Sequence, residues 1–312
     1  MQVSQSARAD RLPEFFLFLS AALLSAVLSG LVLAGCGSGG TDAEEGADDT
    51  RSVEARVEAA ADRLEQSEGG RLVRRAIEAH GGLEAWYRAP TSSYTWEYAN
   101  EGADVQFESF LVADNRTRRV YHDLLTTGAY GDPRPVDARF AWDGERAWIQ
   151  PPNIEQPNPH FWSLSGYYFE QIPFVLADPG LTYEALPPDT LDGEAYDMVR
   201  VGYETDVGYS SGDTYTLYVD RETARVEAIR YTVTYGQDPG EVEDPAQTLF
   251  YYEDYVTVDG LSVPTHFRGF NYRDGERTSF KNEAWADSIS FRRPFDASRL
   301  EPPEGARIVT GP

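Results

Sequence analysis

From residue 91 onward, apolar and polar residues alternate with a period of two. The clearest run is YTWEY at residues 94–98, and the pattern returns near residues 105–111, 229–235 and 250–258. Successive side chains of a strand point to opposite faces, so each of these runs has one apolar and one polar face. This pattern is typical of an antiparallel sheet that is covered on one side. We therefore predict a meander of roughly ten strands, which makes the chain mainly β.

Asp-Gly dipeptides separate several of these runs, at residues 143–144, 192–193, 259–260 and 274–275. The dipeptide suits the positive φ angles of tight hairpin turns, so it indicates antiparallel strands that are neighbours in the chain. Residues 220–224 predict a slightly longer hairpin. No repeat of about 20–50 residues indicates a propeller or a solenoid.

Before the sheet, apolar residues recur at helical spacing. We predict an amphipathic helix over residues 51–68, and Gly69-Gly70 is expected to interrupt it. A second helical stretch starts at Leu72. Gly81-Gly82 is expected to end it, because glycine tolerates the left-handed conformation that follows a helix. His80, in the last turn, is expected to be a cation that complements the helix dipole.

Residues 160–180 (HFWSLSGYYFEQIPFVLADPG) break the alternation. The segment is rich in aromatic residues and ends in Asp-Pro-Gly. We predict a helix or lid that covers the apolar side of the sheet and contributes to a site for an apolar ligand. The alternative is ordinary core packing. The candidate ligand-binding residues are Phe161, Trp162, Tyr168, Phe169 and Phe174.

The N-terminal segment has the order of a secretory signal peptide. Arg8 and Arg11 precede an apolar run at residues 15–33, and Cys36 is the only cysteine. The run LAGC that ends at Cys36 resembles the lipobox of bacterial lipoproteins, which implies that this cysteine receives a diacylglyceryl group and becomes the new N-terminus. The 19-residue run is also long enough to span a membrane, which is the alternative. Two acyl chains hold a protein stably on a bilayer, so we predict a lipid anchor at Cys36.

The chain is strongly acidic, with 52 Asp and Glu against 27 Lys and Arg and a formal net charge of −25. So acidic a chain is not expected to bind nucleic acid through phosphate contacts. Lys281 is the only lysine. An excess of acids with almost no lysine favours a salt-loving source, whereas a high-GC codon bias is the alternative explanation for arginine.

No motif indicates catalysis. GYSSG at residues 208–212 matches G-x-S-x-G, but that pattern requires a helix after the serine. DTYTLYVD at residues 213–220 predicts a strand instead, so we assign Ser210 to a loop. None of the four histidines is spaced with another like a metal ligand. We therefore predict no enzyme activity, no cofactor and no metal site.

Four short motifs resemble a family of bacterial envelope lipoproteins similar to the LolA/LolB-like carriers of outer-membrane lipoproteins. They are AIEAHGGLEAW (76–86), FAWDG (140–144), PFVLADPG (173–180) and VPT (263–265). The resemblance extends over residues 72–308. It implies a half-open antiparallel barrel with a long helix on its concave face and an apolar cavity for acyl chains.

We therefore expect an α+β fold, mainly β, with an N-terminal helix on the concave face of a half-barrel and a helical lid insertion. The expected divisions are a signal peptide (1–35), a flexible acidic tether (36–50), the amphipathic helix (51–68) and the half-barrel domain (69–312). The expected function is that of an envelope lipoprotein, anchored to the outer membrane, that binds a lipid or a lipoprotein acyl chain. The alternative is a structural lipoprotein of an envelope assembly, with a solid core.

Overall fold

The computed structural model describes residues 52–204, 213–232, 234–235 and 246–311. The chain divides into two units, residues 1–42 and 43–312, and every described residue belongs to the second. The predicted signal peptide, Cys36, the predicted tether and Ser210 lie outside the described residues. In the part of the chain that is described, no helix has the length and apolar character needed to cross a membrane.

Three helices open the described chain: α2 (Val53–Glu65), α3 (Glu68–Ala79) and α4 (Gly82–Arg88). Ser52 caps α2 and Ser67 caps α3, each accepting a hydrogen bond from a backbone N–H of the first turn. The prediction that Gly69-Gly70 interrupts the helices is wrong, because both glycines lie inside the first turn of α3. A Cβ on Gly69 would lie 2.9 Å from the backbone of β6, and one on Gly70 would lie 2.2 Å from the Leu64 carbonyl oxygen. Glycine is therefore needed there for close packing.

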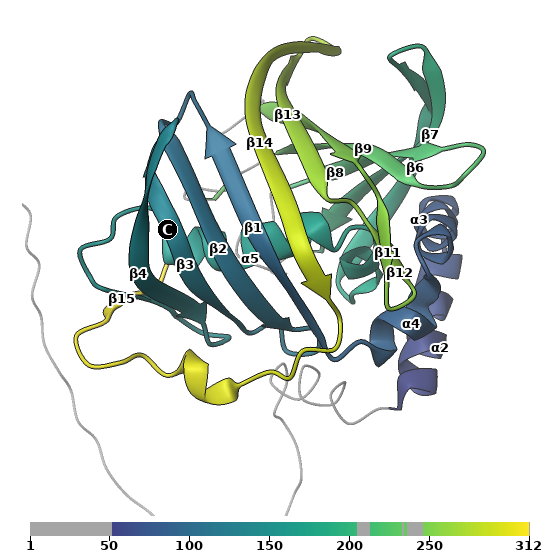
Figure 1. Ribbon diagram of the computed structural model, residues 1–312. Coiled ribbons are helices and arrows are strands. Elements are labelled where there is room, and N and C mark those ends of the chain that lie inside the picture. Colours follow the sequence, from purple (N-terminus) through teal and green to yellow (C-terminus); the bar gives the residue numbers. More distant parts are fainter. Residues whose placement is uncertain (1–51, 205–212, 233, 236–245, 312) are drawn as a thin grey trace, which may run out of the picture. The chain divides into compact units, whose positions relative to one another are not determined.

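The rest of the domain is one open antiparallel sheet of 13 strands, in the order β15-β5-β4-β3-β2-β1-β14-β13-β10-β9-β8-β7-β6, with a separate β11-β12 hairpin (Figure 1). The predicted mainly β, half-open architecture is confirmed. The strands of the large sheet are β1 Thr91–Asn100, β2 Val105–Asp114, β3 Val120–Ala129, β4 Asp132–Trp142, β5 Ala147–Gln150, β6 Leu181–Leu191, β7 Glu194–Tyr203, β8 Tyr215–Asp220, β9 Val226–Thr232, β10 Gln247–Glu253, β13 His266–Arg273, β14 Glu276–Ser290 and β15 Arg307–Val309; those of the hairpin are β11 Val256–Val258 and β12 Leu261–Val263.

Three of the four Asp-Gly turns have the predicted geometry. Asp192, Asp259 and Asp274 have φ angles of 52–54°, and the glycine after each also has a positive φ. The fourth, at 143–144, belongs to a longer link in which only the glycine has a positive φ. The alternation of β1 is also confirmed, because Tyr94, Trp96 and Tyr98 are all buried on the inner face.

The concave face of the sheet carries the main core. Helix α5 (Pro159–Glu170) runs across this face, and the 3-10 helix η1 (Phe174–Ala177) follows it (Figure 1). Helix α3 packs against β6 and β7, so the expected N-terminal helix covers one end of the face. A second 3-10 helix, η2 (Ala297–Leu300), belongs to the C-terminal segment, which packs against the outer face through the Trp148 indole N–H and the Leu300 carbonyl, 2.6 Å apart.

Candidate functional site: the concave face and helix α5

Helix α5 is formed by the segment that breaks the strand pattern. Asn158 caps it by accepting a hydrogen bond from the His160 N–H, and Pro159 occupies the first turn, where its missing N–H has no helical partner in any case. The segment was predicted as a helix or lid, and the helix is present. It lies against the sheet, so the lid role remains a prediction.

Two of the predicted ligand-binding residues on α5 contact opposite halves of the sheet. The Trp162 ring lies 4.4 Å from Tyr98 on β1 and 4.9 Å from Phe107 on β2, between ring centroids. The Phe169 ring lies 4.7 Å from Tyr231 on β9. Both α5 residues are only partly buried. The helix therefore bridges the concave face with aromatic contacts.

The other three predicted residues have separate surroundings. Phe174 is fully buried and stacks on Trp86 of α4 at 5.1 Å, so it is a core residue of η1. Phe161 and Tyr168 are partly buried and contact Tyr235 and Tyr167 respectively. The structure thus brings four of the five candidates together on α5 and places Phe174 beside the N-terminal helices.

Hydrogen bonds hold α5 along its length. His122 on β3 lies with Nε2 3.0 Å from the Ser163 carbonyl oxygen, and the Tyr252 hydroxyl donates to the Phe169 carbonyl oxygen at 2.9 Å. At the start of the helix, His160 Nδ1 lies 2.7 Å from the Tyr235 hydroxyl. Sequence reasoning missed these contacts, because the partners are polar residues scattered over distant strands.

A partly buried ion pair fixes the end of this segment. Arg118, in the turn between β2 and β3, donates from Nη2 to both carboxylate oxygens of Asp178 at 2.7 Å. Its other terminal nitrogen contacts the hydroxyl of Tyr167 on α5. The Arg118 side chain is only 17% exposed. Two-point contacts of this kind are the stronger type of ion pair, so the residues after α5 are held firmly.

The interface between α5 and the sheet also contains buried polar atoms without a hydrogen-bond partner among the described residues. They are Ser163 Oγ, Glu170 Oε1, Gln171 Oε1, Tyr94 Oη and Trp96 Nε1. Glu170 is fully buried, and desolvation raises the pKa of its carboxyl well above the usual range. A buried polar atom without a partner costs about 1–3 kcal/mol. Hydrogen bonding of the buried polar atoms between α5 and the sheet is therefore incomplete among the described residues.

Gly166 sets how closely α5 approaches the sheet. A Cβ at this position would lie 3.1–3.2 Å from three atoms of the Trp96 ring. Such a distance is tighter than ordinary carbon packing, so the helix backbone rests directly on the indole. A larger residue at Gly166 would push α5 away from β1.

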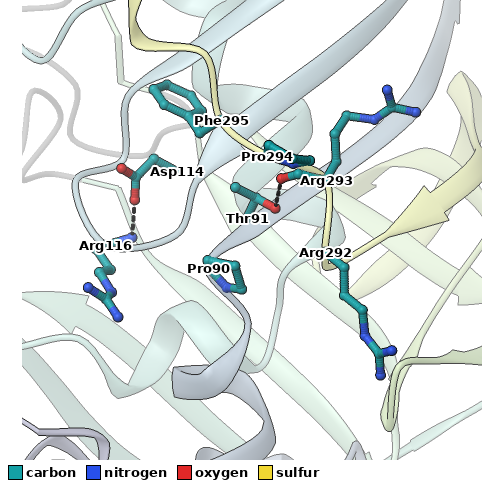
Figure 2. Close-up of a pocket in the computed structure, with 8 residues that line it drawn as sticks. All are labelled: Pro90, Thr91, Asp114, Arg116, Arg292, Arg293, Pro294 and Phe295. Atoms are coloured by element: carbon teal, nitrogen blue, oxygen red, sulfur yellow. Dashed lines mark hydrogen bonds between the residues drawn. The ribbon is translucent and has the colours of Figure 1, made fainter.

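Two surface cavities lie away from α5. One, of about 260 Å³, lies where the start of β1, the β2–β3 turn and residues 292–295 meet (Figure 2). The other, of about 290 Å³, lies beside the 189–192 and 275–277 turns. Neither is lined by an α5 residue.

His80 has a structural role in the core. His80 caps α3 and is fully buried, with Nδ1 2.9 Å from the Ser262 carbonyl oxygen and Nε2 accepting from the Val226 N–H. Desolvation lowers its pKa to about 4, so the expected cation is wrong: the ring is neutral at pH 7 and joins α3 to two strands. Over the described ranges, no group of three or more His, Cys, Asp and Glu residues could hold a metal ion.

No protein-family model and no curated protein sequence matches the chain. Among solved structures, it is similar to a LolA superfamily protein from Nitrosomonas europaea, with 12% identity, a TM-score of 0.45 and coverage of 72% of this chain and 94% of that one. A DUF1329 family protein from Desulfovibrio piger has 11% identity and a TM-score of 0.45 over 81% of this chain and 98% of its own. The lipoprotein LppX from Mycobacterium tuberculosis has 9% identity and a TM-score of 0.26, over 74% of this chain and 100% of its own. The first of these proteins bears the name of the superfamily that the four motifs resemble.

Proposed function

We propose that the protein is a non-enzymatic envelope lipoprotein that binds a lipid or acyl chain between α5 and the concave face of its half-barrel. The observation that carries this proposal is the interface itself. Aromatic rings of α5 meet aromatic rings of the sheet, while five buried polar atoms there have no hydrogen-bond partner among the described residues. In the proposed liganded state, α5 moves outward and becomes the lid over the bound chain.

The energetics favour such an exchange. An acyl chain inserted under α5 would replace ring–ring contacts with ring–chain contacts, so apolar burial, at about 25 cal/mol per Å², would be largely retained. The unpartnered oxygen of Glu170 and the hydroxyl of Tyr94 would at the same time gain access to the polar end of the ligand or to water. The hydrogen bonds from His122 and Tyr252 end on backbone carbonyls of α5, and they would oppose the movement.

Titration of the full chain with a fluorescent fatty acid tests the proposal. Trp162→Ala combined with Phe169→Ala should weaken binding, because these partly exposed rings would contact the ligand. The matched control is Tyr130→Ala, an aromatic residue that is 41% exposed at the β3–β4 turn. The urea midpoint of each variant separates lost binding from lost stability, because truncating a fully buried aromatic costs about 3–5 kcal/mol.

A second candidate is a structural lipoprotein with a solid core. It is favoured by the observation that neither of the two cavities described above is lined by a residue of α5. Native mass spectrometry of protein extracted from its own membrane discriminates the two. A co-purifying lipid supports the carrier. No lipid, no fatty-acid binding by the wild type, and a stability loss of several kcal/mol in the double variant support the scaffold.

A further inference from the structure

Lys281, the only lysine of the chain, lies in a β-bulge of β14. Gly269 of β13 pairs with Asn282, and the next residue, Phe270, pairs with Phe280, so Lys281 is an extra residue between two pairs. In a regular strand, adjacent side chains point to opposite faces. A bulge can turn a side chain toward the other face. Lys281 and Asn282 can therefore share a face of the sheet although they are neighbours in the chain.

The ammonium of Lys281 reaches the concave face. Its Nζ donates to Thr248 Oγ1 on β10 at 2.7 Å. Thr248 lies directly opposite Tyr231 of β9, so the two side chains are on the same face. The Tyr231 ring in turn contacts Phe169 of α5, with 4.7 Å between the ring centroids. The ammonium therefore lies on the side of the sheet that α5 covers.

Asn282 extends this polar region toward β1. Its Nδ2 donates to the Tyr98 hydroxyl at 3.1 Å, and the Tyr98 ring contacts Trp162 of α5. Burial raises the pKa of the Tyr231 hydroxyl, and side-chain hydrogen bonds with Asn282 and Thr248 oppose that rise. Strands β14, β13 and β10 lie between β1 and β9 in the sheet. The polar groups on β14 and β10 therefore lie between the two aromatic contacts that join α5 to the sheet.

The charge of Lys281 is not balanced by a carboxylate. Its side chain is partly buried, and burial lowers the pKa of the ammonium. Among the described residues, no Asp or Glu forms an ion pair with Nζ, although the chain has 52 of them. An ammonium has three N–H donors, and one of them is used by Thr248. The other donors are therefore available to a ligand.

We propose that Lys281 binds the carboxylate of a free fatty acid whose chain lies between α5 and the concave face. The inference rests on the proposed function and names the class of its ligand. A single ammonium matches the single charge of a carboxylate, and the rings of Tyr98 and Tyr231 provide apolar surface on either side of it. A hydrogen bond between two charged groups is stronger than one to a neutral ester. Partial burial strengthens the pair further, because a buried pair is screened less by salt.

The test compares cis-parinaric acid, a fluorescent fatty acid, with its methyl ester on the full chain at about pH 7.5, where a carboxyl group is ionised. Lys281→Gln should weaken binding of the acid about 10- to 100-fold, the loss of one charge-assisted hydrogen bond, and leave binding of the ester unchanged. Lys281→Arg keeps the charge and should retain most of the binding. Arg134→Gln is the matched control, because it removes the same charge from an exposed residue that pairs with Asp132 in the β3–β4 turn.

A second measurement uses the wild type. Lysine labelled with ¹³C at Cε gives one NMR signal, because the chain has one lysine. Saturating fatty acid should raise the pKa of Lys281, since a carboxylate beside an ammonium favours the charged form, whereas the methyl ester should not raise it in this way. This readout requires no variant, so it is independent of any effect of a substitution on stability.

Acid binding that depends on Lys281 but not on Arg134, together with a raised pKa of Lys281, supports the proposal. Equal binding of acid and ester by the wild type, or an unchanged pKa of Lys281 in the fatty-acid complex, overturns the carboxylate contact and leaves the site under α5 to a neutral lipid. Binding of neither compound contradicts the proposed function itself, and the carboxylate contact is rejected with it.

Discussion

The imidazole of His122 on β3 holds α5 to the sheet, with Nε2 3.0 Å from the carbonyl oxygen of Ser163. The other ring nitrogen, Nδ1, lies 3.1 Å from the Ser109 hydroxyl. A neutral ring satisfies both contacts when Nε2–H donates to the carbonyl and Nδ1 accepts from the hydroxyl. The ring also stacks on Phe140 at 4.1 Å. Desolvation lowers its pKa to about 4, so the buried ring is neutral at pH 7.

The burial of the His122 ring predicts a loss of stability in acid. The unfolded chain binds a proton at His122 near pH 6.5, whereas the folded chain does so only near pH 4. Stability is therefore complete above about pH 6.5 and is lost as the pH falls toward 4, by roughly 3 kcal/mol. His80 has the same shift and adds a similar loss. His122→Phe should flatten part of the profile of urea midpoints from pH 7 to pH 4.5, and an unchanged slope would contradict a neutral buried ring.

The buried carboxyl of Glu170 predicts that stability falls as the pH rises, which is opposite to the dependence predicted for His122. Its folded-state pKa is raised well above 4.5 by desolvation. The stability that the protonated group contributes is complete below about pH 4.5 and is lost as the pH rises through the folded-state value. Glu170→Gln should therefore stabilise the protein more at pH 8 than at pH 4.5, as measured by urea unfolding. Glu58→Gln, on an exposed position of α2, is the control and should show no such difference.

Gly70 provides a test of packing against helix propensity. Inside a helix, glycine to alanine favours folding by about 1 kcal/mol on propensity alone. Here the added Cβ would lie 2.2 Å from the Leu64 carbonyl oxygen, so Gly70→Ala should instead destabilise the protein by about 1–3 kcal/mol. Gly102→Ala, whose Cβ would be 3.5 Å from its nearest neighbour, is the control. Thermal melting compares them, and a more stable Gly70→Ala would show that α2 and α3 pack differently.

Cys36 predicts the mature N-terminus. Because the thiol is the proposed acylation site, Cys36→Ser should leave the chain without its lipid and release it from membranes, or stop its processing. Intact mass spectrometry of the membrane and soluble fractions measures both effects. A mature wild-type chain that starts at any other residue would contradict the anchor.

The excess of acids predicts a salt-dependent stability. Mutual repulsion among surplus carboxylates opposes the compact state when it is unscreened. The melting temperature should therefore rise substantially between about 0.1 M and about 2 M KCl, as screening shortens the range of the repulsion. A flat profile would show that the negative charges are well dispersed and would remove the argument for a salt-loving source.

The sequence predicted those strands and turns that depend on only a few consecutive residues. The alternation at residues 94–98 placed Tyr94, Trp96 and Tyr98 on one buried face, because strand geometry has a strict period of two. Three Asp-Gly turns adopted the expected backbone for an equally local reason. Strands too short for a readable alternation, such as β5 and β15, were missed. The edge strand β6 was obscured by its two prolines, which an edge position tolerates.

Contacts between distant segments decided the site. The residues of α5 indicated a helix, but only the tertiary structure showed that it lies under the sheet, held by His122 at one point and resting on Trp96 at Gly166. The Arg118–Asp178 pair and the charge of His80 were equally hidden, because burial and partner choice depend on which chain segments meet. Backbone conformation is governed by neighbours in the chain, whereas desolvation and packing are properties of the assembled fold.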